Sequence, residues 1–321
     1  MRDITASEST KLKLRKKSGF IHEILTNKTL YLMTLPGVLL LLIFNYAPMV
    51  GIIIAFKDFR YDLGAFRSKW VGFRNFEFFL KTPDSWLITR NTVLYNIAFI
   101  VTGIVISVAF AVLLNELRNK FMAKAYQSLM ILPFFLSWII GGYLLFALLS
   151  MDKGFLNNTI FKLLGKEPIF WYSETKYWPG IILMANTWKY AGYNSIIYMA
   201  AITGIDNEMY EAAVIDGASK WQQITKITLP MLVPTICILV LMQLGRIINA
   251  DFAMFFNLPL DNGALYPVTN VIDTYVYRAL MFTRDFSLST AAGLYQSVVG
   301  FTLVVVSNFI VKKINPERAL F

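Results

Sequence analysis

The stretch MYEAAVIDGASKWQQITKITLP (residues 209–230) sets charged residues and a single glycine between long apolar segments. Just ahead of it lies Asp206, a residue type that caps helices, and the helix dipole favours Glu208 in the first turn. Gly217 stands where a helix end needs a positive φ. We therefore predict two short helices here, 207–216 and 218–228, joined at Gly217.

The apolar segments on both sides of this stretch indicate a membrane protein. Of the 321 residues 56% are hydrophobic, and they come in six blocks, of which only one contains a charge, Lys189. About 20 apolar residues in helical form cross a hydrocarbon core. Backbone groups in lipid must bond within their own segment, which favours helices over strands. We predict an all-α integral membrane protein with six transmembrane helices, at 30–56, 91–114, 125–151, 177–204, 227–245 and 286–311.

The basic residues predict the orientation of these helices. Seven of the 30 Lys and Arg precede the first block, and such a cluster attracts anionic headgroups and stays in the cytoplasm. Six spans then place the carboxyl terminus inside as well. We predict a basic arm at 1–29, a permease domain at 30–314 that includes a loop at 205–228, and a tail at 315–321. The net charge of +10 needs no nucleic-acid partner to explain it, because a membrane surface does so.

The residue inventory argues against catalysis by this chain. One Cys, Cys237, and one His, His22, exclude an internal disulfide, a Cys-rich metal site and a His-pair metal site. No Gly-rich phosphate loop is present, since the pair Gly165–Lys166 lacks the upstream glycine and the hydroxyl residue. We therefore expect no catalytic residue and no bound metal. Any nucleotide hydrolysis must come from another chain.

The predicted topology places the opening stretch in the cytoplasm, between the fourth and fifth spans. Ala212, Ala213 and Ala218 leave room for a partner backbone, with Glu211 as an exposed charge beside them. In the second helix Trp221, Ile224 and Ile227 share one face, which we expect to pack back on the bundle. The residues fit a docking element for another protein equally well as an amphipathic helix lying on the membrane.

A resemblance distinguishes these two interpretations. The string EAAVIDGASKWQQITKITLPMLVP resembles the EAA loop of ABC importer permeases, in which Glu-Ala-Ala is followed by a glycine and then Ile-x-Leu-Pro. The segments WVGFRNFEFFL, INADF and VIDTYVYRAL resemble the carbohydrate-uptake permeases, in particular their LplB-like, polysaccharide-type branch. The resemblance covers about 30–314 and implies the type I ABC importer permease fold, in a multi-pass protein of the bacterial plasma membrane.

The resemblance also implies partners and a role for the loop. Such permeases pair with a second permease, two ATPase subunits that hold ATP and Mg²⁺, and an extracellular solute-binding protein that delivers an oligosaccharide. This chain would bind no cofactor of its own, and membrane lipid would surround it. The loop would be the coupling helix that contacts the ATPase, through Glu211, Ala212, Ala213, Asp216, Gly217 and Ala218.

Polar residues in the fourth span are candidates for the substrate pathway. Lys189 lies about 18 Å deep if the helix enters near Tyr177, and a charge there costs roughly 3 kcal/mol unless it faces the bundle interior or a wet cavity. Around it stand side chains that suit a sugar, and we predict a pathway stripe of Asn186, Lys189, Tyr190, Tyr193 and Asn194. The alternative is that Lys189 bonds backbone carbonyls at a kink or pairs with the partner permease.

A second polar group, Gln243, Arg246, Asn249 and Asp251, follows the fifth span. We assign it to the same pathway, although a structural network is the favoured alternative, and a spacing of five is poor for an Arg246–Asp251 pair within one helix. Two cations, Lys189 and Arg246, with no acidic residue inside a span would suit an acidic oligosaccharide such as a uronate.

Two other classes of protein compete with a sugar permease. A self-sufficient secondary transporter or channel would keep the loop on the membrane surface, but no internal repeat supports it. A membrane enzyme lacks a catalytic set. An ABC permease for another class of solute also fits the loop.

Overall fold

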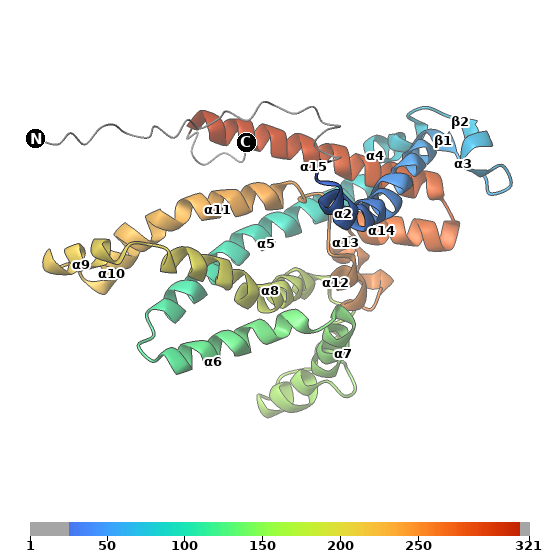
Figure 1. Ribbon diagram of the computed structural model, residues 1–321. Helices are drawn as coiled ribbons and strands as arrows, with labels where there is room; N and C mark the ends of the chain where they lie inside the picture. Colours follow the sequence, from blue (N-terminus) through green and yellow to red (C-terminus); the bar gives the residue numbers. More distant parts are fainter. Residues whose placement is uncertain (1–25, 315–321) are drawn as a thin grey trace, which may run out of the picture. The chain divides into compact units, whose positions relative to one another are not determined.

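The computed structural model describes residues 26–314, and the chain in this range is mostly helical (Figure 1). Two compact units make up the chain and divide between Ile52 and Ile53. Most of the predicted arm, 1–29, and all of the predicted tail, 315–321, lie outside the described residues.

One helical run forms the described part of the first unit and continues into the second. It consists of α2 (Lys28–Leu41), the π-helical turn η1 (Leu42–Tyr46) and the 3₁₀ segment η2 (Ala47–Phe56). No residue of α2 or η1 is buried. A helix that is apolar on every side and this long is typical of a membrane span. The run corresponds to the predicted first span, 30–56.

The aromatic segment after this run folds as a small sheet with short helices. Strand β1 (Lys57–Asp58) pairs antiparallel with β2 (Lys69–Trp70), with Lys57 opposite Trp70. Between and after them come α3 (Gly64–Arg67), η3 (Arg74–Phe76) and α4 (Glu77–Lys81). The buried ammonium of Lys57 donates to the Phe66 carbonyl at 2.7 Å, and Phe56 stacks on Trp70. Local contacts therefore order this segment.

Two long helices run side by side through the second unit. In α5 (Pro83–Asn115), Thr82 caps the first turn and Pro83 occupies a position where its missing N–H costs nothing. Its partner is α8 (Trp178–Thr203). Tyr95 packs near Trp178 at one end, and Ala111 packs near Ile202 at the other. The two helices therefore run in the same direction.

The predicted third span, 125–151, is wrong as a single helix. The chain forms α6 (Lys120–Ile131) and η4 (Leu132–Phe135), then turns by 98° into α7 (Trp138–Leu149). Pro133 lacks a backbone N–H, and Leu136 adopts an extended conformation. Ser137 then caps the new helix by accepting from the amide of Ile140. A broken span of this kind needs neighbours to satisfy its freed backbone groups.

The second predicted helix of the opening stretch, 218–228, begins at Lys220 and continues past Thr228 into the predicted fifth span. It joins α10 (Lys220–Gln223), the π-helical turn η7 (Ile224–Thr228) and α11 (Leu229–Leu244) into one 25-residue run. Ser219 and Gln222 form a capping box at its start. Pro230 stands just after η7, where the wider turn accommodates its missing N–H. The predicted fifth span, 227–245, is the second part of this run.

Several short elements and one further long helix, α15, complete the second unit. Before α8 lie η5 (Leu156–Phe161) and η6 (Thr175–Tyr177), and α9 (Asn207–Ile215) lies between α8 and α10. After α11 the chain forms α12 (Phe252–Asn257), η8 (Gly263–Leu265), α13 (Tyr266–Thr269), α14 (Ile272–Arg278), η9 (Ala279–Thr283) and α15 (Phe286–Ile314).

Four helical runs in residues 26–314 are long and apolar enough to span a membrane, or five if the bent pair α6–α7 is one span. The four are Lys28–Phe56, Pro83–Asn115, Lys220–Leu244 and Phe286–Lys313. The predicted fourth span corresponds to α8, whose 26 residues are long enough but too polar to be counted by composition.

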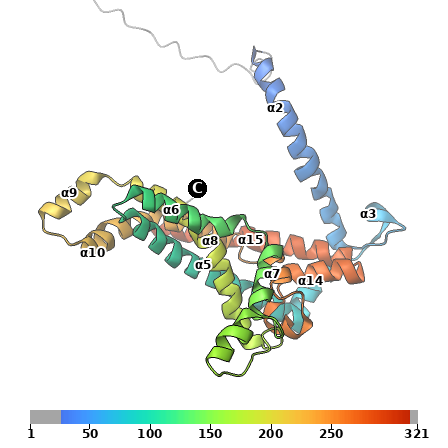
Figure 2. The same ribbon diagram turned by 90° about the horizontal axis from the view of Figure 1, so that it is seen from below.

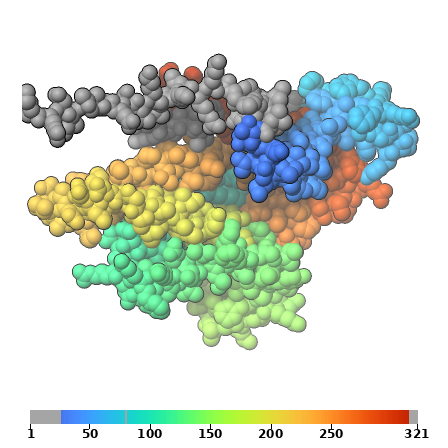
Figure 3. Space-filling model, viewed as in Figure 1, coloured from blue at the N-terminus to red at the C-terminus, as the bar shows by residue number. Residues whose placement is uncertain are grey.

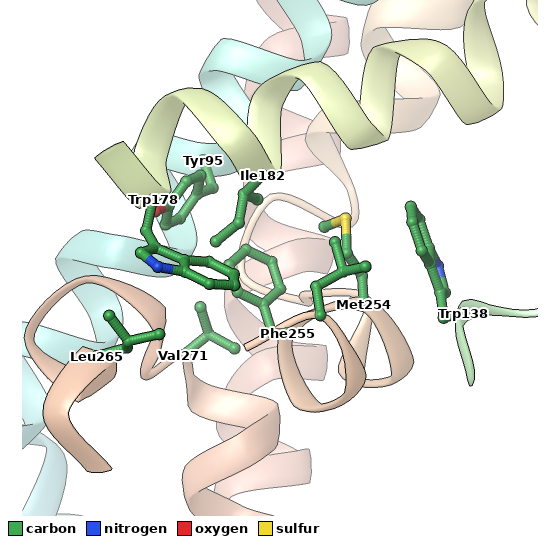
Figure 4. Packing of buried hydrophobic residues seen from close by; sticks show 9 residues of the cluster. Tyr95, Trp138, Trp178, Ile182, Met254, Phe255, Leu265 and Val271 are labelled. Carbon is green, nitrogen blue, oxygen red and sulfur yellow. The ribbon is translucent and has the colours of Figure 1, made fainter. Parts of the chain in front are cut away.

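The largest core cluster joins helices that are distant in sequence (Figure 4). Trp178 and Ile182 of α8 meet Tyr95 of α5, and Met254 and Phe255 of α12 pack beneath them. Trp178 is fully buried, and its indole N–H donates to the Trp171 carbonyl at 2.7 Å. This cluster fixes α12 against α5 and α8, next to the polar residues described below.

Candidate functional site

The opening stretch forms a capped helix that ends in a left-handed glycine. The side chain of Asp206 accepts from the Glu208 amide at 3.0 Å, as predicted for the start of α9. At the other end Gly217 has a φ of +79°. The Ala218 amide donates to the Ala213 carbonyl, and the Gly217 amide donates to that of Val214. This pair of bonds is a Schellman motif, so the prediction of a helix end at Gly217 is confirmed.

Helices α9 and α10 protrude at one end of the second unit (Figures 2 and 3). In α9 no residue is buried. Glu211, Ala212, Asp216 and Gly217 are exposed, while Ala213 and Ala218 are half-buried. The apolar side chain of Ile215 is 85% exposed. The predicted loop residues therefore share one accessible tip.

The prediction that Trp221 packs back on the bundle is wrong. Its side chain is 72% exposed, whereas Gln223 is buried and donates to the Ala218 carbonyl at 3.2 Å. The tip is held instead by polar bonds, because the hydroxyls of Tyr210 and Thr228 lie 2.9 Å apart. An exposed indole on a capped, rigid tip suits contact with another surface.

In α8 the predicted polar stripe divides into buried and accessible parts. Lys189 is only 7% exposed; its ammonium donates to the carbonyl of Leu136 at the α6–α7 break and lies 4.8 Å from the centroid of the Trp138 ring. This contact is the one that the alternative interpretation of Lys189 expects, a bond to a carbonyl at a kink. The freed carbonyl of the broken span thereby gains a donor.

The other residues of the stripe differ in their contacts and in their exposure to solvent. The Asn186 amide lies 3.9 Å from the Met254 sulfur, and the Tyr193 ring stacks on Phe134 with centroids 4.0 Å apart. Tyr193 is also partly exposed, and Asn194 is half-buried. Tyr193 is thus the stripe residue with the clearest accessible aromatic face.

The second predicted group lies on a break between α11 and α12. Gln243, Arg246 and Asn249 are exposed, and they follow one another through successive turns, because the Arg246 amide donates to the Gln243 carbonyl and the Asn249 amide to that of Arg246. Residues three apart in such turns lie on the same side. Within the described residues Arg246 forms no ion pair with Asp251.

Polar side chains from neighbouring helices hold this break in place. The amide of Asn96 in α5 donates to the Ile247 carbonyl at 2.8 Å and to the Asn249 carbonyl at 2.9 Å. Gln296 of α15 donates to the Ile248 carbonyl, and Asp273 of α14 accepts from the Ala250 amide at 2.7 Å. The irregular backbone is therefore satisfied on its buried side.

Asp251 belongs to a different set of contacts from Arg246. Its carboxylate accepts from the Trp138 indole N–H at 2.6 Å, from the Tyr190 hydroxyl at 3.1 Å and from the Met254 amide at 3.2 Å. Lys189, Tyr190 and Asp251, predicted from two separate segments, thus meet around Trp138.

Sequence reasoning missed Trp138, Asn96, Gln296 and Asp273 as parts of this region. Asn96 and Gln296 stand in otherwise apolar runs, where an amide costs free energy unless it is bonded, so this signal was available. Trp138 carries no such signal, because a tryptophan in an apolar block usually indicates packing or a membrane interface.

The long apolar helices of this chain are typical of an integral membrane protein. The chain belongs to the family described as binding-protein-dependent transport system inner membrane component, which matches residues 100–318. The predicted family resemblance is confirmed.

Curated relatives and solved structures agree with this family. The chain is 36% identical to Protein LplB of Bacillus subtilis (strain 168) over 91% of each chain. It is also 36% identical to the polygalacturonan/rhamnogalacturonan transport system permease protein YteP of the same organism, over 97% of this chain and 96% of that one.

Among solved structures, it matches a bacterial ABC transporter involved in the import of the acidic polysaccharide alginate, with a TM-score of 0.83 and 32% identity over 92% of this chain and 99% of that one. It also matches a bacterial alginate ABC transporter solved in complex with an alginate pentasaccharide-bound periplasmic protein, with the same TM-score and identity. The fold is therefore that of a type I ABC permease.

Proposed function

We propose that this chain is the transmembrane permease subunit of an ATP-driven, binding-protein-dependent importer of oligosaccharides. It works with a second permease, with two ATPase subunits that hold ATP and Mg²⁺, and with an extracellular solute-binding protein. The observation that carries the proposal is the capped α9 tip with its Schellman end at Gly217, in a chain of this permease family. Relatives named for polygalacturonan and alginate support the saccharide.

In this proposal α9 is the coupling helix and the chain itself hydrolyses no nucleotide. Glu211 and the Ala212–Ala213 face meet the ATPase, and the exposed side chains of Ile215 and Trp221 extend the contact. A rigid tip transmits force better than a flexible loop, and both of its ends are capped. Closure of the ATPase pair then moves α8 and α10–α11, which flank the tip.

The membrane topology of the proposal has six spans, with both termini in the cytoplasm. Helix α8 serves as the fourth span and the bent pair α6–α7 as the third. The polar residues that exclude α8 from a count by composition are compatible with a span that faces other helices or a wet pathway rather than lipid. The tip then lies inside, and the segments 57–90 and 152–176 lie outside. The segment 251–285 belongs to the outer side as well, with its first residue, Asp251, folded back against Tyr190 of α8.

The pathway of this permease is proposed to run past the α11–α12 break. An exposed Arg246 at membrane depth would be costly against lipid, and Gln243 and Asn249 on the same side add hydrogen-bonding groups. Irregular backbone at this depth is tolerated where it lines a cavity. Arg246, rather than the carbonyl-bonded Lys189, is therefore the cation placed to meet a carboxylated sugar.

The coupling role is tested on the assembled complex in lipid nanodiscs, with its binding protein added. Changing Glu211→Ala or Gly217→Pro should abolish most of the binding-protein-stimulated ATP hydrolysis while the subunits still co-purify. Thr225→Ala serves as the control, because it lies nearby but bonds only within its own helix. Unchanged stimulation in both tip variants would refute coupling through α9.

The substrate class is tested by measuring binding of the solute-binding protein to a glycan panel, followed by uptake. Arg246→Gln should reduce uptake of a bound uronate oligosaccharide at least tenfold more than uptake of a neutral one. An equal loss for both would remove the acidic-substrate proposal and leave the importer proposal standing.

A further inference from the structure

One carboxylate joins three helices that are distant in sequence. Asp251 follows the α11–α12 break and caps α12 through the Met254 amide. Its Oδ2 atom accepts from Trp138 Nε1 in α7 and from the Tyr190 hydroxyl in α8. Figure 4 shows Trp138 on the Met254 side of the core cluster, apart from Trp178. Hydrogen bonds to an ionised acceptor are stronger than neutral ones, and a partly buried site strengthens them further.

A second contact connects the same helices beside the first. Lys189, the neighbour of Tyr190, reaches the Leu136 carbonyl at the α6–α7 break, and its ammonium lies over the Trp138 ring. Helix α8 therefore holds both sides of the break, the carbonyl that ends η4 and the indole that begins α7. The broken span is fastened at the point where its own backbone bonds stop.

These contacts lie far from the α9 tip, although α8, which supports the tip, takes part in them. Tyr190 is roughly 20 Å before the end of α8, and the α10–α11 run that leads from the tip toward Asp251 is about 37 Å long at 1.5 Å per residue. Asp251 follows this run after the break 245–250, so its bonds connect α8 to the chain that continues from α11. Helix α7 has no covalent link to α8 shorter than the segment 150–177, so packing and these side-chain bonds hold the two helices together.

We propose that Asp251 is a positioning residue that locks α7, α8 and the start of α12 into one rigid body, which moves as a unit when the tip moves. The movement of this rigid body with the tip rests on the proposed function. The lock itself rests only on the contacts of the chain in this structure. In the proposal Trp138 and Tyr190 are the two donors, and Lys189 closes the break beside them. The bent pair α6–α7 then follows α8 instead of hinging at Leu136.

Spin-label distances test the lock without knowledge of the sugar. The assembled complex carries Cys237→Ala in this chain, with cysteine-free partner subunits, in lipid nanodiscs. One label pair joins α7 to α8 (Tyr143→Cys with Met184→Cys), and a reference pair joins α8 to α15 (Met184→Cys with Phe301→Cys); all three sites are exposed. Distances are measured without nucleotide and after trapping with ATP and vanadate.

We expect the α7–α8 distance to stay within about 2 Å between the two states while the α8–α15 distance changes by more. With Asp251→Asn, which keeps an oxygen to cap α12, the α7–α8 distribution should broaden at least twofold in both states. Asp285→Asn is the matched control, since Asp285 also caps a helix, through the Leu288 amide at 2.8 Å. It should leave the α7–α8 distribution narrow.

Trp138→Phe and Tyr190→Phe each remove one donor, and they test the lock where Asp251→Asn fails to assemble. Tyr190→Phe keeps the whole ring, whereas Trp138→Phe replaces the indole with a smaller aromatic ring. Each should broaden the α7–α8 distribution, and the pair combined should match Asp251→Asn. A narrow distribution in all the variants, or a wild-type α7–α8 distance that moves as much as α8–α15, would overturn the lock. If the α8–α15 distance does not change on addition of ATP and vanadate, the result counts against the importer proposal alone. The α7–α8 distributions of the variants without nucleotide still test the lock.

Discussion

The half-buried carboxylate of Asp273 gives the α11–α12 break a pH dependence. Burial raises the pKa of Asp273 above its ordinary value of 3.8, and the bonds from the Ala250 amide and from Gln296 offset this only in part. The folded chain thus binds this proton more tightly than the unfolded chain. Below pH 3.8 Asp273 is protonated in both the folded and the unfolded chain, so its burial does not lower the stability. Between pH 3.8 and the raised pKa the unfolded chain loses the proton first, and the folded chain becomes progressively less stable. Above the raised pKa this loss of stability is complete.

Asp273→Asn should therefore stabilise the chain at neutral pH and lose this advantage in acid. Both bonds go to the same oxygen of Asp273, which an asparagine can replace. The measurement is the thermal unfolding temperature of the purified complex between pH 4 and pH 8. The difference in unfolding temperature between variant and wild type should grow with rising pH and then level off. A difference that is constant with pH would contradict the role of the Asp273 charge.

Gly192 is a residue that the packing of α8 against α6 requires. A Cβ at this position would overlap the Met130 carbonyl, so the two helices must separate to accept it. Gly192→Ala should cost about 1–3 kcal/mol, the usual range for overpacking. Gly180→Ala in the same helix meets nothing within 4 Å and is the control, which should be neutral or slightly stabilising. Equal unfolding temperatures for the two variants would show that α6 yields without cost.

At the scale of elements, caps were predictable and bends were not. Both ends of α9 could be predicted from Asp206 and Gly217, because helix capping depends only on residues that are neighbours in the sequence. The 98° turn after Pro133 falls within the predicted single span 125–151 and was not predicted. A proline ends a run of backbone bonds, but the direction of the next helix depends on tertiary partners such as Lys189 and Asp251.

The site followed the same division. The polar stripe of α8 and the polar group after α11 could be recognised as polar residues within apolar segments. The sequence did not indicate which of these residues are buried. Lys189 and Arg246 look alike in the sequence, but the first bonds a carbonyl inside the bundle and the second is exposed. Helical periodicity gives a residue's face and not its neighbours.

The α9 element should lose rigidity when its glycine end is removed. Gly217→Ala forces an alanine into the left-handed region at a cost of about 1–2 kcal/mol, which should fray the Schellman end. Hydrogen exchange at the amides of Gly217 and Ala218 in the complex should rise roughly 5-fold or more, because both lose their bonds. Gly204→Ala, at a glycine of ordinary φ before α9, is the control. Unchanged protection at Ala218 would mean that partner contacts, not the glycine, hold this end.

At the scale of the whole molecule, α8 decides the topology. It is the one long helix between position 153 and position 219, so these two positions lie on opposite sides of the membrane only if α8 crosses it. Its polarity argues against a crossing by composition, whereas its buried partners argue for one.

In the Cys237→Ala background, we expect Lys153→Cys to react with a membrane-impermeant maleimide in intact cells. Ser219→Cys should react only after permeabilisation, with denatured samples defining complete labelling. Labelling of Ser219→Cys in intact cells would place the α9 tip outside, and it would remove both the six-span topology and the coupling role proposed for α9.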